Sequence, residues 1–304
     1  QGSQFVGMAA DLYESSPPAR AVLERADEVL GFSLTDIMFG SKDESEAELS
    51  RERLTQTQNT QPALFVHSLA AFAAIKGGAL KPEMVAGHSL GEYSALAAAG
   101  AINFEDGLRT VRLRGELMAG AGKIRPGSMA AILGMEDADV EKLCADASQD
   151  GIVRAANFNS PGQVVISGDV DAVSRAIEMA PERGARRALP LPVSGAFHSP
   201  LMDDATGGLT EALAALNIDS PSCPIYCNVT ARSTTDPDEI RLRLVEQLTA
   251  PVLWAQTLGA MQADGASNFV EIGAGKVLCG LVKRTLGREF ATRSVSTTAD
   301  IEST

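Results

Sequence analysis

The chain has 304 residues, of which 45% are hydrophobic, and its formal net charge is −13. It is long enough for one large domain, or for a large domain that carries a smaller inserted one. The acidic balance excludes non-specific nucleic-acid binding, which needs a basic face. No apolar run approaches the roughly 20 residues of a membrane helix. No signal peptide is recognisable either, so we expect no membrane partner.

The first predicted elements are helices. Apolar residues recur at helical spacing over residues 18–30, and Gly31 ends this helix. A second helix is predicted over residues 60–75, with Pro62 in its first turn. This helix is apolar nearly all round, which indicates burial. His67 lies within it and is interpreted as a satisfied core residue.

The next stretch has the order strand, tight turn, helix. A short apolar segment, residues 84–86, precedes the pentapeptide GHSLG, and helix formers follow it. This order is typical of a nucleophile elbow, which would present Ser89 outward. Gly87 and Gly91 would avoid collisions at the bend, and the Leu90 amide would lie at a helix N-terminus, where an oxyanion is stabilised. A plain turn is the alternative, but the flanking elements favour a catalytic serine.

A further helix is predicted over residues 104–118, with Asn103 as its N-cap. Arg114 falls within the apolar arc of this helix. A guanidinium among apolar neighbours needs a partner, because burying an unpaired charge is costly. From the spacing alone, a structural ion pair and a ligand-binding role are equally supported. Residues 122–127 are interpreted as a linker.

After this linker the pattern of elements changes. Two helices are predicted over residues 137–147 and 170–180, and four strands over residues 129–133, 153–158, 163–168 and 185–190. Residues 159–162 are interpreted as a turn. The resulting order, βαββαβ, is that of a ferredoxin-like unit. It predicts an inserted subdomain of about 70 residues.

The last third returns to alternating helices and strands. Helices are predicted over residues 203–216, 239–249 and 277–286, and strands over 225–229 and 269–273. Together with the elbow, they predict an α/β fold, with an α/β-hydrolase-like core built on a parallel sheet. The core would comprise residues 1–124 and 194–304, and the ferredoxin-like subdomain residues 125–193.

The cysteines give no sign of a metal or redox site. They show no zinc-ligand spacing and are interpreted as buried thiols, at Cys144, Cys223, Cys227 and Cys279. Free thiols fit a reducing cytoplasm. We therefore expect a cytoplasmic protein without a metal.

A serine nucleophile needs a base, and the chain has three histidines. His88 adjoins Ser89 and points in a different direction, and His67 is interpreted as core. His198, in a loop predicted over residues 192–202, is therefore the candidate base. No acidic residue near it in sequence is an obvious partner, so a dyad is as plausible as a triad.

Seven motifs together resemble one known family, the malonyl-CoA:acyl carrier protein transacylases. They follow the family's order over nearly the whole chain, and they are specific in combination rather than singly. They are QGSQ at 1–4, TQPAL at 60–64, GHSLGEYSAL at 87–96, VRLRG at 111–115, NFNSPGQ at 157–163, AFH at 196–198, and EIG at 271–273 with GKVL at 275–278.

The resemblance implies a role for each candidate residue. Ser89 is the nucleophile that carries the malonyl ester, and His198 is its general base and acid. The backbone carbonyl of Gln247 orients His198. The amides of Leu90 and Gln1 form the oxyanion hole. In the family a strand and a glycine precede the first motif, so we expect native residues before Gln1.

The resemblance also implies the acyl specificity. Arg114 grips the free carboxylate of the malonyl group, because a planar guanidinium suits a carboxylate. Phe197 resembles the residue of malonyl-selective relatives, and its ring should crowd a 2-methyl branch. Further residues are implied to line the site, namely His88, Met118 and Asn159.

The implied partners are malonyl-CoA and acyl carrier protein, with no cofactor, and we expect the chain to act as a monomer. The family's carrier proteins are acidic, as this chain is, so a local basic patch must offset their repulsion. Two clusters are candidates, Lys123 with Arg125, and Lys276 with Lys283, Arg284 and Arg288.

Three alternatives stay open. A serine esterase of α/β-hydrolase type shares the elbow, but it would use water as acceptor and would not need Arg114. An acyltransferase of a polyketide pathway shares the chemistry. A carrier-protein-binding module with a decayed site would form no adduct on Ser89.

Overall fold

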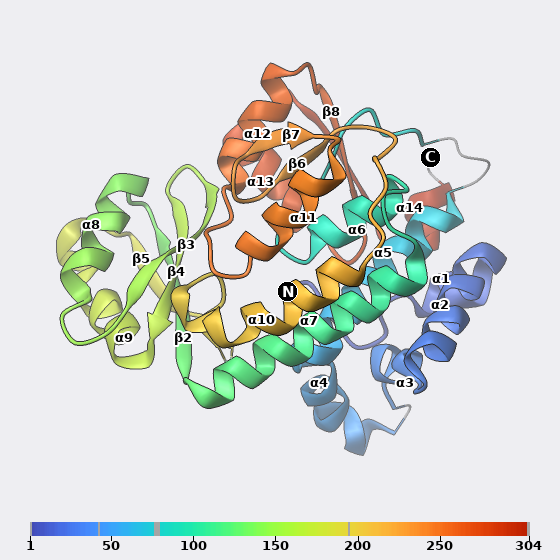
Figure 1. Cartoon of the computed structure of the whole chain (residues 1–304), viewed down its shortest axis with the longest axis horizontal. Helices are drawn as coiled ribbons and strands as arrows, with labels where there is room; N and C mark the ends of the chain where they lie inside the picture. The colour runs from blue at the N-terminus through green and yellow to red at the C-terminus, as the bar shows by residue number, and fades with distance from the viewer. Residues whose placement is uncertain (1, 42, 76–79, 194, 303–304) are drawn as a thin grey trace.

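The computed structural model describes residues 2–41, 43–75, 80–193 and 195–302. It is an α/β protein in which helices surround small separate sheets (Figure 1). Two residues named in the predictions lie outside the described residues. They are Gln1, predicted to contribute to the oxyanion hole, and Ser194, predicted to begin the second part of the core. Within the described part, no helix is both long and apolar enough to span a bilayer.

The N-terminal part is helical. Its elements are α1 (Ala10–Ser15), α2 (Pro17–Leu30), α3 (Leu34–Phe39), the 3₁₀ helix η1 (Glu44–Glu46), α4 (Ala47–Thr55) and α5 (Thr57–Ala74). The predicted start of α5 was wrong, because the helix begins at Thr57 and Pro62 lies in its interior. A proline cannot donate to the carbonyl four residues before it. Here the Gln58 carbonyl accepts a hydrogen bond from Arg112 Nη1 instead, at 2.8 Å.

The long helix α7 (Phe104–Ile124) lies under the middle of the molecule, beside α10 (Asp203–Ala215) (Figure 1). The linker predicted over residues 122–127 is wrong, because α7 continues to Ile124 and Gly127 already opens the next strand. Ala121 and Gly122 are buried, so packing holds the last turn of the helix in place despite its glycines.

The strands around the elbow form two small sheets. In one, β1 (Val85–Ala86) pairs in parallel with β6 (Ile225–Cys227), which pairs antiparallel with β7 (Arg232–Thr234). In the other, β8 (Asn268–Ile272) pairs in parallel with β9 (Ala291–Val295). Parallel pairing is therefore present, but the two pairs are not joined into one sheet. The remaining helices of this part are α6 (Gly91–Ala98), η4 (Pro200–Met202), α11 (Pro237–Glu246), α12 (Trp254–Ala263), α13 (Val277–Thr285) and α14 (Thr298–Glu302).

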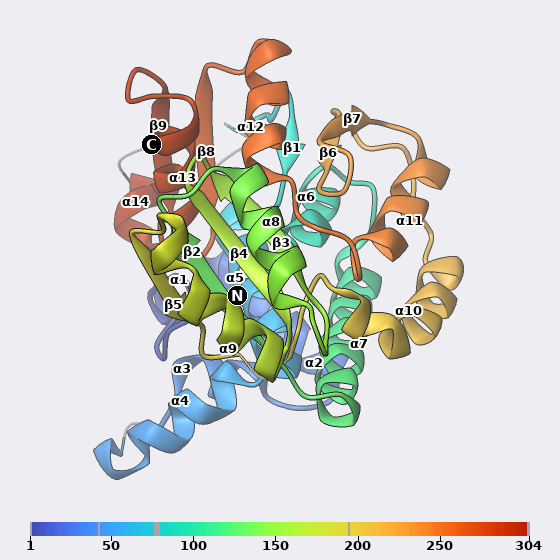
Figure 2. The same ribbon diagram turned by 90° about the vertical axis from the view of Figure 1, so that its left-hand side faces the viewer.

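A four-stranded unit projects from one side of the molecule (Figures 1 and 2). It contains β2 (Gly127–Leu133), α8 (Asp137–Ala147), β3 (Val153–Ser160), β4 (Gln163–Asp169), α9 (Val170–Met179), η3 (Pro181–Arg183) and β5 (Arg187–Pro190). The predicted order βαββαβ is confirmed, and the strands pair antiparallel in the order β3-β4-β2-β5. Asn159 belongs to β3, so the predicted turn is shorter than residues 159–162.

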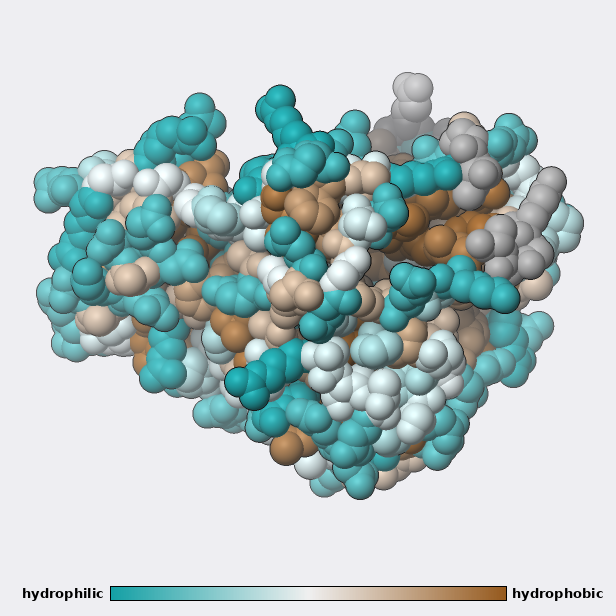
Figure 3. Space-filling model, turned by 90° about the horizontal axis from the view of Figure 1, so that it is seen from above, coloured by the Kyte–Doolittle hydropathy of each residue, from teal (hydrophilic) through white to brown (hydrophobic). Residues whose placement is uncertain are grey.

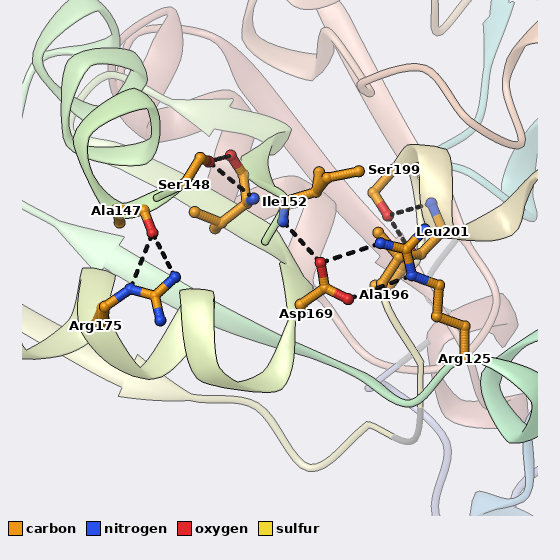
Figure 4. A network of polar contacts seen from close by, with 10 residues as sticks. Arg125, Ala147, Ser148, Ile152, Asp169, Arg175, Ala196, Ser199 and Leu201 are labelled. Atoms are coloured by element: carbon orange, nitrogen blue, oxygen red, sulfur yellow. Dashed lines mark hydrogen bonds and ion pairs between the residues drawn. The ribbon is translucent and has the colours of Figure 1, made fainter. Parts of the chain in front are cut away.

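Polar contacts close the ends of this unit (Figure 4). Asp169, the last residue of β4, accepts a hydrogen bond from the Ile152 amide and forms an ion pair with Arg125. Because Arg125 directly follows α7, this pair ties the four-stranded unit to the long helix. Ser148 and Arg175 bond backbone groups at the C-terminal end of α8 and near β3.

The hydrophobic core is divided in the same way. One cluster is packed mainly between α2, α5, α6, α7 and α10, a second lies within the four-stranded unit, and a smaller third joins α12 and α13. The four cysteines are free and buried, as predicted. The face seen in Figure 3 is mostly hydrophilic or intermediate, with small hydrophobic areas between polar residues.

Candidate active site

Ser89 lies at the tight turn between β1 and α6, with a positive φ of 54°. This backbone conformation is costly for a residue with a side chain and persists where the surroundings impose it. A Cβ at Gly87 would lie 1.9 Å from the backbone of Gly91, so the turn requires glycine at 87. A Cβ at Gly91 would meet nothing within 4 Å, so the predicted collision there is wrong.

Asn228, the residue after β6, holds this turn from the neighbouring strand. Its Oδ1 accepts a hydrogen bond from the Ser89 amide at 2.6 Å, and its Nδ2 donates to the Gly87 carbonyl at 2.8 Å. One side chain therefore fixes the backbone on both sides of His88. Sequence reasoning missed this residue; the only signal was a polar asparagine within the strand predicted over residues 225–229, and the structure shows that it is fully buried.

His198 lies against the serine hydroxyl. Its Nε2 is 2.7 Å from Ser89 Oγ, and its Nδ1 is 2.8 Å from the Gln247 backbone carbonyl. A carbonyl can only accept, so Nδ1 carries the proton and Nε2 is left to accept from the hydroxyl. Burial, with the positive charge of Arg114, lowers the pKa of His198 to about 3. The imidazole is therefore neutral at neutral pH and able to take a proton.

Arg114 reaches the same hydroxyl from α7, although its side chain is almost fully buried. Its Nη2 donates to Ser89 Oγ at 3.1 Å and to Gln247 Oε1 at 2.9 Å. Its Nη1 donates to Gln61 Oε1 at 2.6 Å. It forms no ion pair with any described residue. Two neutral amide oxygens thus position a cation beside the serine, and no carboxylate of the described chain pairs with it directly.

Glu92 is a second buried ionisable residue, one turn after Ser89 on α6, and it is 1% exposed. Its Oε2 accepts hydrogen bonds from Gln247 Nε2 at 2.6 Å and from the Asn228 amide at 3.3 Å. Burial raises the pKa of Glu92 to about 7. No role was predicted for Glu92, Gln61 or the side chain of Gln247, although Gln61 and Glu92 stand within the quoted motifs at 60–64 and 87–96.

The residues predicted to line the site are close to this centre. His88 Nε2 is 2.8 Å from Asn159 Oδ1, and the His88 ring lies 5.5 Å from that of Trp254. Burial lowers the pKa of His88 to about 4. Met118 Sδ accepts a hydrogen bond from Gln61 Nε2, and Phe197, the residue before His198, is 5% exposed.

The chemistry of this arrangement is that of acyl transfer. It combines a hydroxyl, a neutral base that its partner orients, and a cation that could hold an anionic group of the acyl chain. The Leu90 amide, at the N-terminus of α6, donates to no acceptor among the described residues, so it is free to bind an oxyanion. Among those residues, no group of three or more His, Cys, Asp or Glu side chains could hold a metal ion.

Known proteins are similar to this chain in sequence and in structure. Residues 1–301 match the acyl transferase domain family. A malonyl CoA-acyl carrier protein transacylase of Bacillus subtilis is 45% identical over 303 residues, which cover 99% of this chain and 93% of that protein. An acyl carrier protein S-malonyltransferase of Vibrio cholerae has a TM-score of 0.92 at 42% identity, covering 100% of this chain and 96% of that one. A malonyl-transacylase in complex with a type II PKS acyl-carrier protein has a TM-score of 0.91 at 38% identity, with the same coverage.

Proposed function

This chain belongs to the malonyl CoA-acyl carrier protein transacylase family of acyl transferases, and on that premise we propose that it moves a malonyl group from malonyl-CoA to the phosphopantetheine thiol of an acyl carrier protein. The observation that carries the proposal is the buried Arg114 cation, 3.1 Å from Ser89 Oγ and without an ionic partner in the described chain. Such a charge is costly unless a ligand neutralises it. The free carboxylate of a malonyl group is a suitable ligand.

The reaction proceeds in two half-reactions. Ser89 Oγ attacks the thioester carbonyl while His198 Nε2 takes the hydroxyl proton. The free Leu90 amide, with the Gln1 amide as second donor, stabilises the tetrahedral oxyanion. The carbon–sulfur bond then breaks, and the departing thiolate of CoA takes the proton from His198. Ser89 is left as a malonyl ester.

The second half-reaction is the reverse with a new thiol. His198 takes the proton of the phosphopantetheine thiol, and the thiolate attacks the ester carbonyl. The bond to Ser89 Oγ breaks, and the proton returns to that oxygen. No net redox change occurs, so neither half-reaction needs a cofactor.

The acyl specificity comes from the groups around Ser89. Arg114 holds the carboxylate through its two terminal nitrogens, which Gln61 and Gln247 already orient. Phe197 crowds a 2-methyl branch, which favours malonyl over methylmalonyl. The pocket is completed by His88, Met118 and Asn159.

We propose an α/β-hydrolase-like core of residues 1–124 and 194–304 with a ferredoxin-like insert of residues 125–193. The elbow between β1 and α6, with β1 parallel to β6, supports the first assignment. The strand order β3-β4-β2-β5 supports the second. The four free cysteines support a cytoplasmic location.

The pathway served is proposed to be fatty acid biosynthesis. A polyketide pathway is the second candidate, supported by the relative that was solved with a type II PKS acyl-carrier protein. For the docking of an acidic carrier protein we favour the exposed cluster on and near α13, formed by Lys276, Lys283, Arg284 and Arg288. Arg125 of the other cluster is already paired with Asp169.

Intact-mass spectrometry tests the proposal. After incubation with malonyl-CoA we expect one malonyl adduct on the chain, its absence in Ser89→Ala, and its loss when holo acyl carrier protein is added. Acetyl-CoA and methylmalonyl-CoA should give slower acylation. Release of the adduct to water at the same rate without carrier protein would favour the esterase, and no adduct at all would favour a carrier-binding module.

A further inference from the structure

The side chain of Gln247 joins the nucleophile, the cation and the buried carboxylate. Its Nε2 donates to the Ser89 carbonyl at 3.0 Å and to Glu92 Oε2 at 2.6 Å. Its Oε1 accepts from Arg114 Nη2 at 2.9 Å. The same residue also holds His198 through its backbone carbonyl, so its side chain and main chain serve different partners.

The orientation of this amide decides whether Arg114 has an acceptor. A glutamine side chain can turn either its oxygen or its nitrogen toward a neighbour. In the opposite orientation the NH₂ group would face the guanidinium, donor against donor, and the oxygen would face the carbonyl of Ser89 and the carboxylate of Glu92. Nε2 also lies 3.5 Å from Asn228 Oδ1, and of its three acceptors Glu92 is the nearest and the only carboxylate, so it contributes most to fixing the orientation.

Because these three side chains are buried, the loss of one of them leaves the hydrogen-bonding groups of the others unsatisfied. Glu92, Arg114 and Gln247 are each at most 1% exposed, so water cannot replace a missing partner. Arg114 and Glu92 form no direct ion pair, and the Gln247 amide bridges them. The cation thereby stays available to a ligand, while a carboxylate close by partly balances its charge.

We propose that Glu92 is a positioning residue for acyl selection, acting through the Gln247 amide to hold the Arg114 guanidinium in place for a carboxylate-bearing acyl group. This inference rests on the proposed function. It concerns malonyl over acetyl selectivity rather than the acyl transfer that Ser89 and His198 perform.

The test measures second-order rate constants for acylation of Ser89 at pH 8, separately with malonyl-CoA and acetyl-CoA. In Glu92→Leu we expect the malonyl-to-acetyl ratio to fall about tenfold, the typical effect of one lost charge-assisted hydrogen bond. In Glu92→Gln the ratio should fall less, because the new amide oxygen can still accept a hydrogen bond from Gln247. The matched control is Glu246→Gln. Glu246 is adjacent to Gln247 in sequence, but its carboxylate is partly exposed and pairs with Arg243.

Gln247→Ala supplies an independent arm, since it removes the bridging amide and keeps the backbone carbonyl that holds His198. It should lower the ratio as Glu92→Leu does, and the double variant should show no further loss. If Glu92→Leu fails to fold, the ratio measured in Gln247→Ala still tests the inference.

Any of three results would overturn the inference. The first is an equal loss of acylation rate with both substrates in Glu92→Leu, which would indicate a structural role at the Asn228 amide. The others are an unchanged malonyl-to-acetyl ratio in Gln247→Ala and additive losses of this ratio in the double variant. The proposed function fails separately, if the wild type and Glu246→Gln form no malonyl adduct.

Discussion

Around Ser89 the buried space is filled with polar and charged side chains, whereas the four-stranded unit buries mainly apolar ones. The first region encloses Glu92, Arg114 and His198, each at most 5% exposed, in a continuous hydrogen-bond network. Among its described residues the second region has no buried charged side chain. Its core consists of valine, isoleucine, leucine and similar residues such as Val140, Leu143, Val164 and Ile166.

The difference separates what each region contributes. Buried charges cost folding free energy unless they are well partnered, so their presence around Ser89 reflects function rather than stability. Apolar burial contributes stability directly, at roughly 25 cal/mol per Å². Substitutions in the first region should therefore change rates and specificity, and substitutions in the second should change the free energy of unfolding.

The largest expected effect is on the acylation rate in His198→Ala. The neutral imidazole that accepts the Ser89 proton would be lost, and general-base catalysis of this kind contributes about 10²–10⁴-fold. We expect malonyl adduct formation to slow by about 10³-fold, with a thermal midpoint close to the wild type. Rapid-quench intact mass would measure it. A rate within tenfold of the wild type would show that another base acts.

Arg114→Ala is expected to change specificity by about 100-fold. The variant loses the cation that binds the malonyl carboxylate, and charge-assisted hydrogen bonds of this type are worth roughly 1.5–3 kcal/mol. The rate with acetyl-CoA, which has no carboxylate, should be retained or increased. Arg109→Ala is the matched control on the same helix, since that guanidinium is exposed and pairs with Asp106 at the surface. Equal losses with both substrates would show that Arg114 only supports the fold.

These residues also show how far sequence reasoning reached. The elbow could be predicted because glycine spacing and flanking elements are local signals, and the order βαββαβ because each element has its own periodicity. The contacts of Asn228 and Glu92 could not, because their partners are distant along the chain or need side-chain geometry. The ion-pair reading of Arg114 stayed open for the same reason, and the structure places amide oxygens there instead.

Errors in the fold have similar causes. The interior proline of α5 was misplaced because its compensating partner, Arg112, is 54 residues away from Gln58. The end of α7 was predicted too early because local glycine content outweighed tertiary packing that no short window contains. β7 and β9 were missed, since both are short and carry few apolar residues, which leaves a weak local pattern, and each depends on its neighbour for pairing.

In the four-stranded unit, the expected effect is on stability. Ile166 on β4 is fully buried and lies opposite Ala130 and Ala155 of the neighbouring strands. Ile166→Ala should lower the free energy of unfolding by about 2–5 kcal/mol through lost burial and a cavity. Val170→Ala, at an exposed position, should change it by at most about 0.5 kcal/mol. Urea unfolding measures both, while the malonyl-to-acetyl ratio of folded protein should not change.

A smaller effect on stability is expected from acidification, which acts on the buried titratable groups around Ser89. His88 and His198 have pKa values lowered from 6.5 to about 4 and about 3, so both stay neutral in the fold. The unfolded chain binds protons there first, and the stability present above pH 6.5 is lost as the pH falls toward these values. Glu92 acts in the opposite sense, because its pKa is raised to about 7 and its contribution is lost as the pH rises from 4.5 through 7.

The thermal midpoint measured between pH 8 and pH 5 tests this balance. We expect it to fall toward pH 5, and to fall less in a variant that lacks His198. The thermal midpoint of Glu92→Gln should fall more steeply than that of the wild type, since this variant lacks the carboxyl group that gains a proton in the folded state. Identical slopes in all three proteins would show that the acid sensitivity comes from other groups.

The smallest expected effect is at the surface of the four-stranded unit. Arg183 and Asp146 form an ion pair there, with side chains that are 34% and 55% exposed. Water screens such a pair, and ordering two long side chains offsets the attraction, so exposed pairs contribute about 0–1 kcal/mol. Asp146→Asn should therefore lower the free energy of unfolding by less than Ile166→Ala does, and by still less in 1 M salt. A loss above about 2 kcal/mol that persists in salt would mean that ionic contacts, rather than its apolar core, hold this unit together.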